Sequence, residues 1–220
     1  MDGTNDCKAY INKLANIGTN YSFGKVLISA SAGAYSNTNY YFDDTTWLAK
    51  SRFGLDASNS VVAAGASPAS VIYSYHPEHL TISGHITNGV NVAGFFSFGI
   101  HGYPCDCADN AGYATNKSIV FSGNSTWYLL NTVESFNGMR YRYIQGTFMT
   151  WFSSNAFGGI NYSNTPVGSI SYPDEPGLNY VNKPNSYFGL WQGGKNFGIC
   201  VWQSSLQQRI HAVGDPLVRR

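Results

Sequence analysis

The sequence predicts an α/β fold, with a mostly parallel, doubly wound sheet flanked by helices in a single domain. Residues 92–100 carry apolar side chains on both faces of a strand, as at the centre of a sheet that helices cover on both sides. Strand-like and helix-like segments alternate along the 220 residues, which favours parallel strands joined by right-handed crossovers. No internal repeat, low-complexity tract or clear linker divides the sequence.

Five segments are expected to form this sheet, because they are rich in β-branched and aromatic residues and are bounded by turn-forming residues. They are residues 25–30, 69–75, 92–100, 127–133 and 167–172. Helices are expected over residues 57–66, 81–90, 145–157, 187–191 and 197–207, with a further helix after Thr45. Residues 1–24 are expected to be an N-terminal helix and lead-in, and residues 25–220 the α/β domain itself.

The composition limits the kinds of partner that the protein is expected to bind. Charged residues make up 11% of the chain, the formal net charge is +1, and no basic cluster offers a surface to nucleic acid. No apolar stretch approaches the ~20 residues of a membrane-spanning helix. Low charge with heavy use of Tyr, Asn, Ser and Gly favours an extracellular or cell-envelope protein. The segment from Met1 to Asp6 lacks the basic and apolar regions of a signal peptide, so an export signal is expected upstream.

Two chemical features are expected to meet at the carboxyl edge of the sheet, where ligands of such sheets bind. His101 ends one predicted inner strand, with Gly102 allowing the chain to turn, and Ser135 begins the turn after the next strand. An imidazole beside a hydroxyl suits nucleophilic catalysis, and Gly138 allows backbone amides to point toward an oxyanion. The alternative is an ordinary loop histidine and an ordinary turn serine.

The cysteines indicate no metal site. Cys105 and Cys107 lie close to His101, but zinc sites prefer cysteines separated by two to four residues, and no second ligand pair follows. We therefore expect no zinc. Cys200 lies in an apolar run and is expected to be a small core residue.

The carboxylate side chains suggest two further kinds of site. Asp43 and Asp44 form a pair that could bind calcium, although Asp44 could instead cap the helix expected after Thr45. A glycosidase pair could be drawn from Asp43, Asp44, Glu134, Asp174 and Glu175, but the sequence sets no distance between them.

Several motifs together resemble the caspase/gingipain (clan CD-type) peptidase fold, and an uncharacterised bacterial secreted family related to gingipains. The first is a strand followed by His101-Gly102, and the second is a strand followed by Ser135-Phe136-Asn137-Gly138. The more specific part is the late segment, residues 168–176, together with Gly214-Asp215-Pro216-Leu217. The resemblance covers the chain from Lys25 to the C-terminus.

This resemblance implies an active site at the carboxyl edge of the sheet, with His101 as general base and a cysteine nucleophile one strand later. The chain has Ser135 at the position of that cysteine, which suits a degenerate member at least as well as an enzyme. Gly102 and Gly138 take the turn and oxyanion positions, and Glu134, Tyr103 and Phe136 are expected to contact a ligand.

Two functions follow as hypotheses. One is a peptidase-fold hydrolase domain that acts on polypeptides, with His101 as base and either Ser135 or an unrecognised thiol as nucleophile. The other is a non-catalytic extracellular domain that binds glycans or protein partners through surface aromatic residues. Independently of both, the C-terminal turn Gly214-Asp215-Pro216-Leu217 is expected to be structural, because Pro216 fixes φ and Asp215 can accept backbone N–H bonds.

Overall fold

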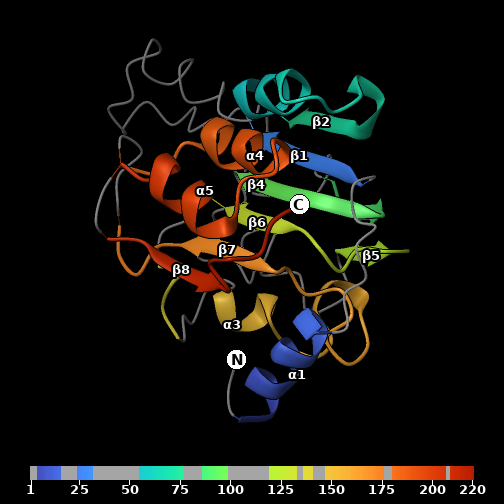
Figure 1. Ribbon diagram of the computed structural model, residues 1–220, viewed down its shortest axis with the longest axis vertical. Helices are drawn as coiled ribbons and strands as arrows, with labels where there is room; N and C mark the ends of the chain where they lie inside the picture. The colour runs from blue at the N-terminus through green and yellow to red at the C-terminus, as the bar shows by residue number, and fades with distance from the viewer. Residues whose placement is uncertain are drawn as a thin grey trace.

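The computed structural model describes residues 4–15, 24–31, 55–76, 86–98, 119–132, 136–140, 147–175, 180–206 and 209–220. Its centre is a six-stranded sheet in the order β2-β1-β4-β6-β7-β8 (Figure 1). Five strands are parallel and β8 is antiparallel to β7. In sheet order the strands are β2 (Val71–His76), β1 (Lys25–Ser31), β4 (Val92–Phe98), β6 (Leu129–Thr132), β7 (Gly168–Ser171) and β8 (His211–Gly214).

Helices cover both faces of this sheet. On one face lie α4 (Pro184–Gln192), α5 (Phe197–Ser204) and the helical residues 55–63 (Figure 1). The opposite face packs against α3 (Phe148–Trp151), the 3-10 turn η3 (Ala156–Gly158) and a small parallel sheet of β3 (Asn88–Val90) and β5 (Val120–Ser122). A second 3-10 turn, η1 (Pro68–Ser70), leads into β2. The predicted fold class, α/β with a mostly parallel sheet flanked by helices, is confirmed.

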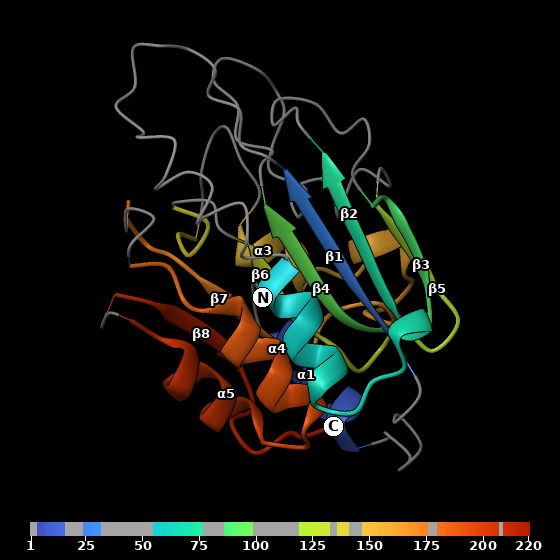
Figure 2. The same ribbon diagram turned by 90° about the horizontal axis from the view of Figure 1, so that it is seen from above.

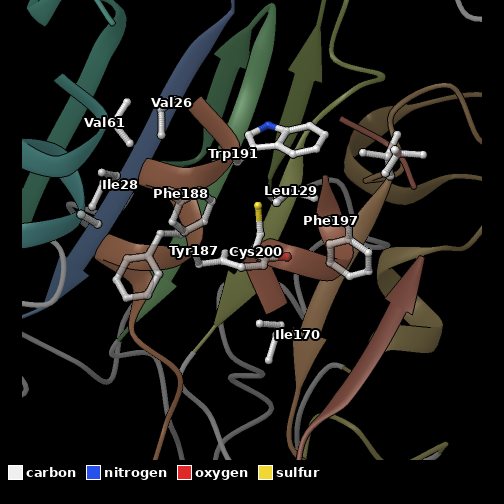
Figure 3. Packing of buried hydrophobic residues seen from close by; sticks show 14 of the residues in the cluster. Val26, Ile28, Val61, Leu129, Ile170, Tyr187, Phe188, Trp191, Phe197 and Cys200 are labelled. Atoms are coloured by element: carbon white, nitrogen blue, oxygen red, sulfur yellow. The ribbon is translucent and has the colours of Figure 1, made fainter. Parts of the chain in front are cut away.

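Neighbouring residues of one strand supply two separate hydrophobic cores. Phe96 of β4 packs in the core under α4 and α5, whereas Phe95 packs in the core under α3 and η3. Both rings are fully buried. Figure 3 shows the first core, with Cys200 of α5 lying among large apolar side chains. A strand that is apolar on both faces is thus covered on both faces, as the sequence of β4 predicts.

The N-terminal helix α1 (Thr4–Ala15) is anchored near the start of β7. The hydroxyl of Tyr10 donates to the carbonyl of Val167 at 2.7 Å and accepts the N–H of Asp215 at 2.8 Å. Lys13 donates to the carbonyl of Thr165 and, at 3.0 Å, to its hydroxyl. Residues 165–167 precede β7 and Asp215 follows the antiparallel β8, so α1 lies at the amino edge of the sheet, opposite the predicted site.

Two expectations need correction, and one strand was not expected. The helix over 81–90 is wrong in its described part, because residues 88–90 form β3 and pair with β5. The helix over 145–157 shortens to Phe148–Trp151 because the chain then turns, with Phe157 at a φ of +51°. The strand β8 is an addition that the sequence does not predict. By contrast, the expectation that Asp215 accepts a backbone N–H is confirmed, since its Oδ1 accepts the N–H of Leu217 at 2.8 Å.

Within the described ranges, no helix combines the length and apolar character that would be needed to cross a bilayer.

Candidate functional site

The carboxyl ends of β4 and β6 lie side by side in the sheet. The two strands are parallel neighbours, and Ser97 of β4 is the register partner of Thr132 of β6. Figure 2 shows the arrowheads of β1, β2 and β4 pointing to the same edge. Ser97 is fully buried, and its hydroxyl has no hydrogen-bond partner among the described residues. The edge that the sequence identifies as the ligand edge therefore brings together the ends of the two predicted motif strands.

A tight turn, residues 136–139, follows β6 and is bound to the end of the next strand. The N–H of Phe136 donates to the carbonyl of Asp174 at 3.1 Å, and the N–H of Gly138 donates to that of Tyr172 at 2.8 Å. The N–H of Met139 closes the turn on the carbonyl of Phe136 at 3.1 Å. These three amide groups are bonded within the protein, so an oxyanion at this edge would have to draw its donors from other groups.

Phe136 has a left-handed backbone, with a φ of +61°. A residue with a Cβ in this region costs roughly 1–2 kcal/mol, so surrounding contacts must hold it there. The turn is held most directly by the next residue, Asn137, which is fully buried. Strain of this kind is concentrated at functional sites, although a well-packed turn can also carry it.

Asn137 links three elements through its side chain and carbonyl. Its Oδ1 accepts the N–H of Tyr172 at 2.7 Å, and its Nδ2 donates to the hydroxyl of Thr132 at 2.5 Å. Its backbone carbonyl accepts the N–H of Phe148, the first residue of α3, at 2.9 Å. The turn is therefore fixed to β6, to the end of β7 and to α3 at once.

Gly138 approaches the main chain just after β7 too closely for any side chain. A Cβ at this position would lie 2.8 Å from the carbonyl carbon of Tyr172 and 2.9 Å from the nitrogen of Pro173. The carbonyl of Gly138 lies 3.2 Å from Nδ1 of His211 in β8, so that nitrogen carries the proton and donates. The ring of His211 also packs edge-on against Phe148, with centroids 4.7 Å apart.

A buried amide pair lies at the same end of β6, on the face covered by α4. Asn131 donates through Nδ2 to Oδ1 of Asn182 at 3.0 Å, and the hydroxyl of Tyr172 donates to the same oxygen. The N–H of Asn182 returns a bond to that hydroxyl at 3.0 Å. Both asparagines are buried. Asn131 and Thr132 are consecutive residues of β6 and therefore face opposite sides of the sheet, so the carboxyl end of β6 is polar on both faces.

Most of the predicted site residues lie outside the described residues. They are Asp43, Asp44, His101, Gly102, Tyr103, Cys105, Cys107, Glu134 and Ser135. Phe136 and Gly138 are described, and both belong to the turn at the carboxyl edge. Asp174 is also at this edge, where its carboxylate forms a surface ion pair with Arg209 at 2.9 Å. Glu175 follows it and is exposed.

The described part of the chain places no cysteine thiol at the turn and contains no metal cluster. Cys200 is fully buried in α5, and burial raises the pKa of its thiol to about 12, so it is a core residue as predicted. Cys7 is an exposed free thiol on α1, away from the described turn. Across the described ranges, no group of three or more His, Cys, Asp or Glu side chains could hold a metal ion.

Sequence reasoning missed the two residues that hold the turn, Asn137 and His211. Asn137 belongs to the turn motif, but its partner Tyr172 is 35 residues further along the chain. His211 lies 73 residues beyond Gly138, in a strand that the sequence does not predict. The Asn-Gly pair after a strand predicts the turn itself, but it gives no signal for the residues that the turn binds.

Comparisons with family models, with curated proteins and with solved structures gave no match for this chain.

Proposed function

We propose that this chain is a caspase/gingipain-like peptidase-fold domain whose site is formed by His101 and Ser135, and that the site is degenerate. As it stands, the domain does not cleave peptides. We place it outside the cell or in the cell envelope, on the grounds of its low charge. The polypeptide that such a site would bind is its expected ligand.

The observation that carries this proposal is the register of β4 and β6. Ser97 and Thr132 are register partners in adjacent parallel strands. His101 follows Ser97 by four residues and Ser135 follows Thr132 by three. An extended chain spans at most about 3.6 Å per residue, so each of the two residues lies within roughly 14 Å of this pair. The spacing supports a site shared by the two strand ends.

The position of Ser135 is restricted further by its neighbour. Ser135 is bonded to Phe136, whose N–H donates to the carbonyl of Asp174 at the end of β7. Two covalently linked Cα atoms are about 3.8 Å apart. Its chain neighbours Thr132 and Phe136, which are both described at the carboxyl edge, support a position for Ser135 near that edge.

The inactive state follows from the chemistry of serine. A thiol has a pKa of roughly 8.5, which a neighbouring imidazole lowers, whereas a hydroxyl must lose its proton to an oriented base during attack. Among the described residues, no carboxylate is bonded to a histidine at this edge, and Asp174 is paired with Arg209. The amide groups of Phe136, Gly138 and Met139 are bonded within the protein, so those three donors do not serve an oxyanion.

Peptide acyloxymethyl-ketone probes, which alkylate activated thiols, test this proposal. We expect no labelling of the wild-type protein, labelling of Ser135→Cys, and loss of that labelling when His101→Ala is added. Peptide hydrolysis by the wild-type protein that disappears in Ser135→Ala would show a working serine enzyme instead. Labelling at Cys105 or Cys107 would place the nucleophile on the other loop.

A second candidate function rests on the exposed apolar residues of α5. Trp202 is 79% exposed, and the exposed Ile199 lies one turn before it on the same side of the helix. Exposed tryptophan suits the binding of glycans or protein partners, as in the non-catalytic alternative. Screening the domain on a glycan array tests it: binding should disappear in Trp202→Ala at unchanged melting temperature. If wild-type protein binds nothing, or if Trp202→Ala binds equally well, this candidate fails.

A further inference from the structure

We propose that the exposed side of α5 docks this protein on an anionic lipid bilayer. Three exposed apolar side chains and three exposed basic ones form what we call the α5 surface. They are Ile199, Trp202 and Leu217, and Lys183, Lys195 and Arg219. The inference goes beyond the proposed function, because it assigns a partner to a different part of the molecule and uses neither His101 nor Ser135.

The apolar part of this surface lies on α5 and on the C-terminal segment beside it. Trp202 is 79% exposed, and the exposed Ile199 lies one turn before it on the same side of the helix. Leu217 is 75% exposed and follows Pro216, whose carbonyl accepts the N–H of Gly198 in the first turn of α5 at 2.9 Å. The C-terminal segment, red in Figure 1, therefore runs against this turn. An indole and two aliphatic side chains thus face solvent along one short helix.

Exposed basic side chains lie at both ends of α5. At its start, Lys195 precedes the N-cap residue Asn196, which forms an antiparallel bridge with Arg219. At its end, the carbonyl of Ser204 accepts the N–H of Lys183 at 2.7 Å. A helix of eight residues is about 12 Å long, so the fold gathers around the apolar side chains three charges that are far apart in the sequence.

The charge of this region is one-sided. Residues 180–220 contain five basic side chains and one acidic side chain, whereas the whole chain has 13 basic and 12 acidic ones. The one acid, Asp215, is engaged in its own turn, where its carboxylate accepts the N–H of Leu217 at 2.8 Å. Of the five basic residues, Arg209 is paired with Asp174. The α5 surface therefore attracts an anionic partner, over the roughly 8–10 Å that charges reach at physiological ionic strength.

The combination of side chains favours a bilayer among anionic partners. Indole rings gather at the membrane interface, aliphatic side chains enter the acyl boundary, and basic side chains attract anionic headgroups. An acidic glycan would engage Trp202 and the basic residues, but it would leave Ile199 and Leu217 in water. A stable protein interface uses about 20–30 residues on each side, many more than the α5 surface offers. A bilayer engages all six side chains and requires no pocket.

Sedimentation of the full chain with sucrose-loaded vesicles tests the inference. The vesicles are phosphatidylcholine alone or a mixture with the anionic lipid phosphatidylglycerol. The test variants are Trp202→Ser and the double variant Lys195→Gln/Arg219→Gln. The matched controls are Ile160→Ser and Lys8→Gln, because Ile160 is exposed just after η3, on the opposite face of the sheet, and Lys8 is exposed on α1. All these side chains are exposed, so the melting temperatures should stay unchanged.

We expect the wild type to sediment with the anionic vesicles and not with phosphatidylcholine alone. Each basic side chain removed near an anionic surface lowers the partition coefficient about fivefold, so the double variant should bind roughly 25-fold more weakly at low salt. Trp202→Ser should bind about tenfold more weakly, because it no longer buries an indole in the interface. Both control variants should bind as the wild type does.

Quenching of tryptophan fluorescence by lipids brominated on their acyl chains adds a second readout. It should occur in the wild type with anionic vesicles and be lost in Trp202→Phe, which keeps an aromatic ring at the surface. The inference is wrong if anionic vesicles do not bind, if both kinds of vesicle bind equally, or if either test variant binds as the wild type does. Quenching that persists in Trp202→Phe would place the contact elsewhere and also refute it. If binding on the glycan array requires Trp202 while no vesicle is bound, the surface serves the second candidate function instead.

Discussion

The N–H of Gly138 donates to the carbonyl of Tyr172 at 2.8 Å, and the two main chains are so close that no Cβ fits between them. Gly138→Ala should therefore displace the turn or strain it, because the added methyl meets backbone atoms that cannot rotate away. We expect a loss of roughly 2 kcal/mol in the free energy of unfolding, measured by urea denaturation.

Gly193→Ala is the matched control for this substitution. Gly193 ends α4, and a Cβ there would approach the carbonyl of Gly189 no closer than 3.4 Å. Its φ is −76°, which alanine adopts readily, so stability should change by less than about 0.5 kcal/mol. Equal stability losses in both alanine variants would contradict the close approach at Gly138.

Lys13 should make stability depend on pH. Burial lowers the pKa of its ammonium from 10.5 to about 7, while it donates to Thr165. Between these two values the unfolded chain binds more protons at Lys13 than the folded chain, so its contribution to the free energy of unfolding rises with pH and is lost as pH falls toward 7.

The measurement is the difference in the free energy of unfolding between wild type and Lys13→Met, from about pH 7 to 9. The opposing contributions of Cys200 and Tyr10, whose pKa values burial raises from 9.0 and 10.0 to about 12, are common to both proteins and cancel in this difference. We expect the free energy of unfolding of the wild type to increase relative to that of Lys13→Met as the pH rises. A difference that stays constant over the window would show that Lys13 is not desolvated in the folded protein.

The thiols of Cys7 and Cys200 should react very differently. Cys7 is exposed on α1, whereas Cys200 is buried and its pKa is raised to about 12. Peptide mapping after iodoacetamide treatment at neutral pH should show Cys7 modified first, with Cys200 slower by at least about a hundredfold. In denaturant the two should react alike. Rapid modification of Cys200 in the native protein would contradict the core described around it.

Asp215 should stabilise the C-terminal turn that closes the fold. Its carboxylate accepts the N–H of Leu217 at 2.8 Å, and the carbonyl of Pro216 accepts the N–H of Gly198 in α5 at 2.9 Å. Asp215→Ala should cost about 1 kcal/mol, which lowers the melting temperature by about 2–4 °C at this chain length. Asp215→Asn keeps an acceptor and should cost less. An unchanged melting temperature in Asp215→Ala would refute the turn's structural role.

The inner strands could be predicted from sequence because burial on both faces leaves a direct signal. Phe95 and Phe96 point into different cores, and β4 is accordingly apolar at consecutive positions. The edge strand β8 carries no such signal, since its four residues are exposed or half-buried. The segment 81–90 resembles a helix in sequence because Ile82, Ile86 and Val90 recur at every fourth position. Residues 88–90 form a strand instead, because they pair with residues 120–122, a long-range pairing that local periodicity does not encode.

For the site, the sequence predicts only the order in which its strand and turn segments follow one another along the chain. A strand followed by Ser-Phe-Asn-Gly predicts a turn at the sheet edge, and the structure has one there. The partners of that turn, Tyr172 and His211, depend on which strands are neighbours and in which direction they run. Local sequence does not encode those pairings, so the role of Asn137 could be recognised only in three dimensions.

We propose above that the chain segments leaving β4 and β6 bring His101 and Ser135 together. A short bis-methanethiosulfonate cross-linker tests it in His101→Cys/Ser135→Cys, with the native Cys7, Cys105 and Cys107 replaced by serine. A second pair, His101→Cys/Ser163→Cys, is the control, because Ser163 is exposed and precedes β7 at the opposite edge of the sheet.

Mass spectrometry of the digested protein gives the fraction of each pair that is bridged. We expect an intramolecular bridge between positions 101 and 135 and none between positions 101 and 163. If both thiols of the first pair react singly without bridging, or if the two pairs bridge equally, the two residues do not share a site.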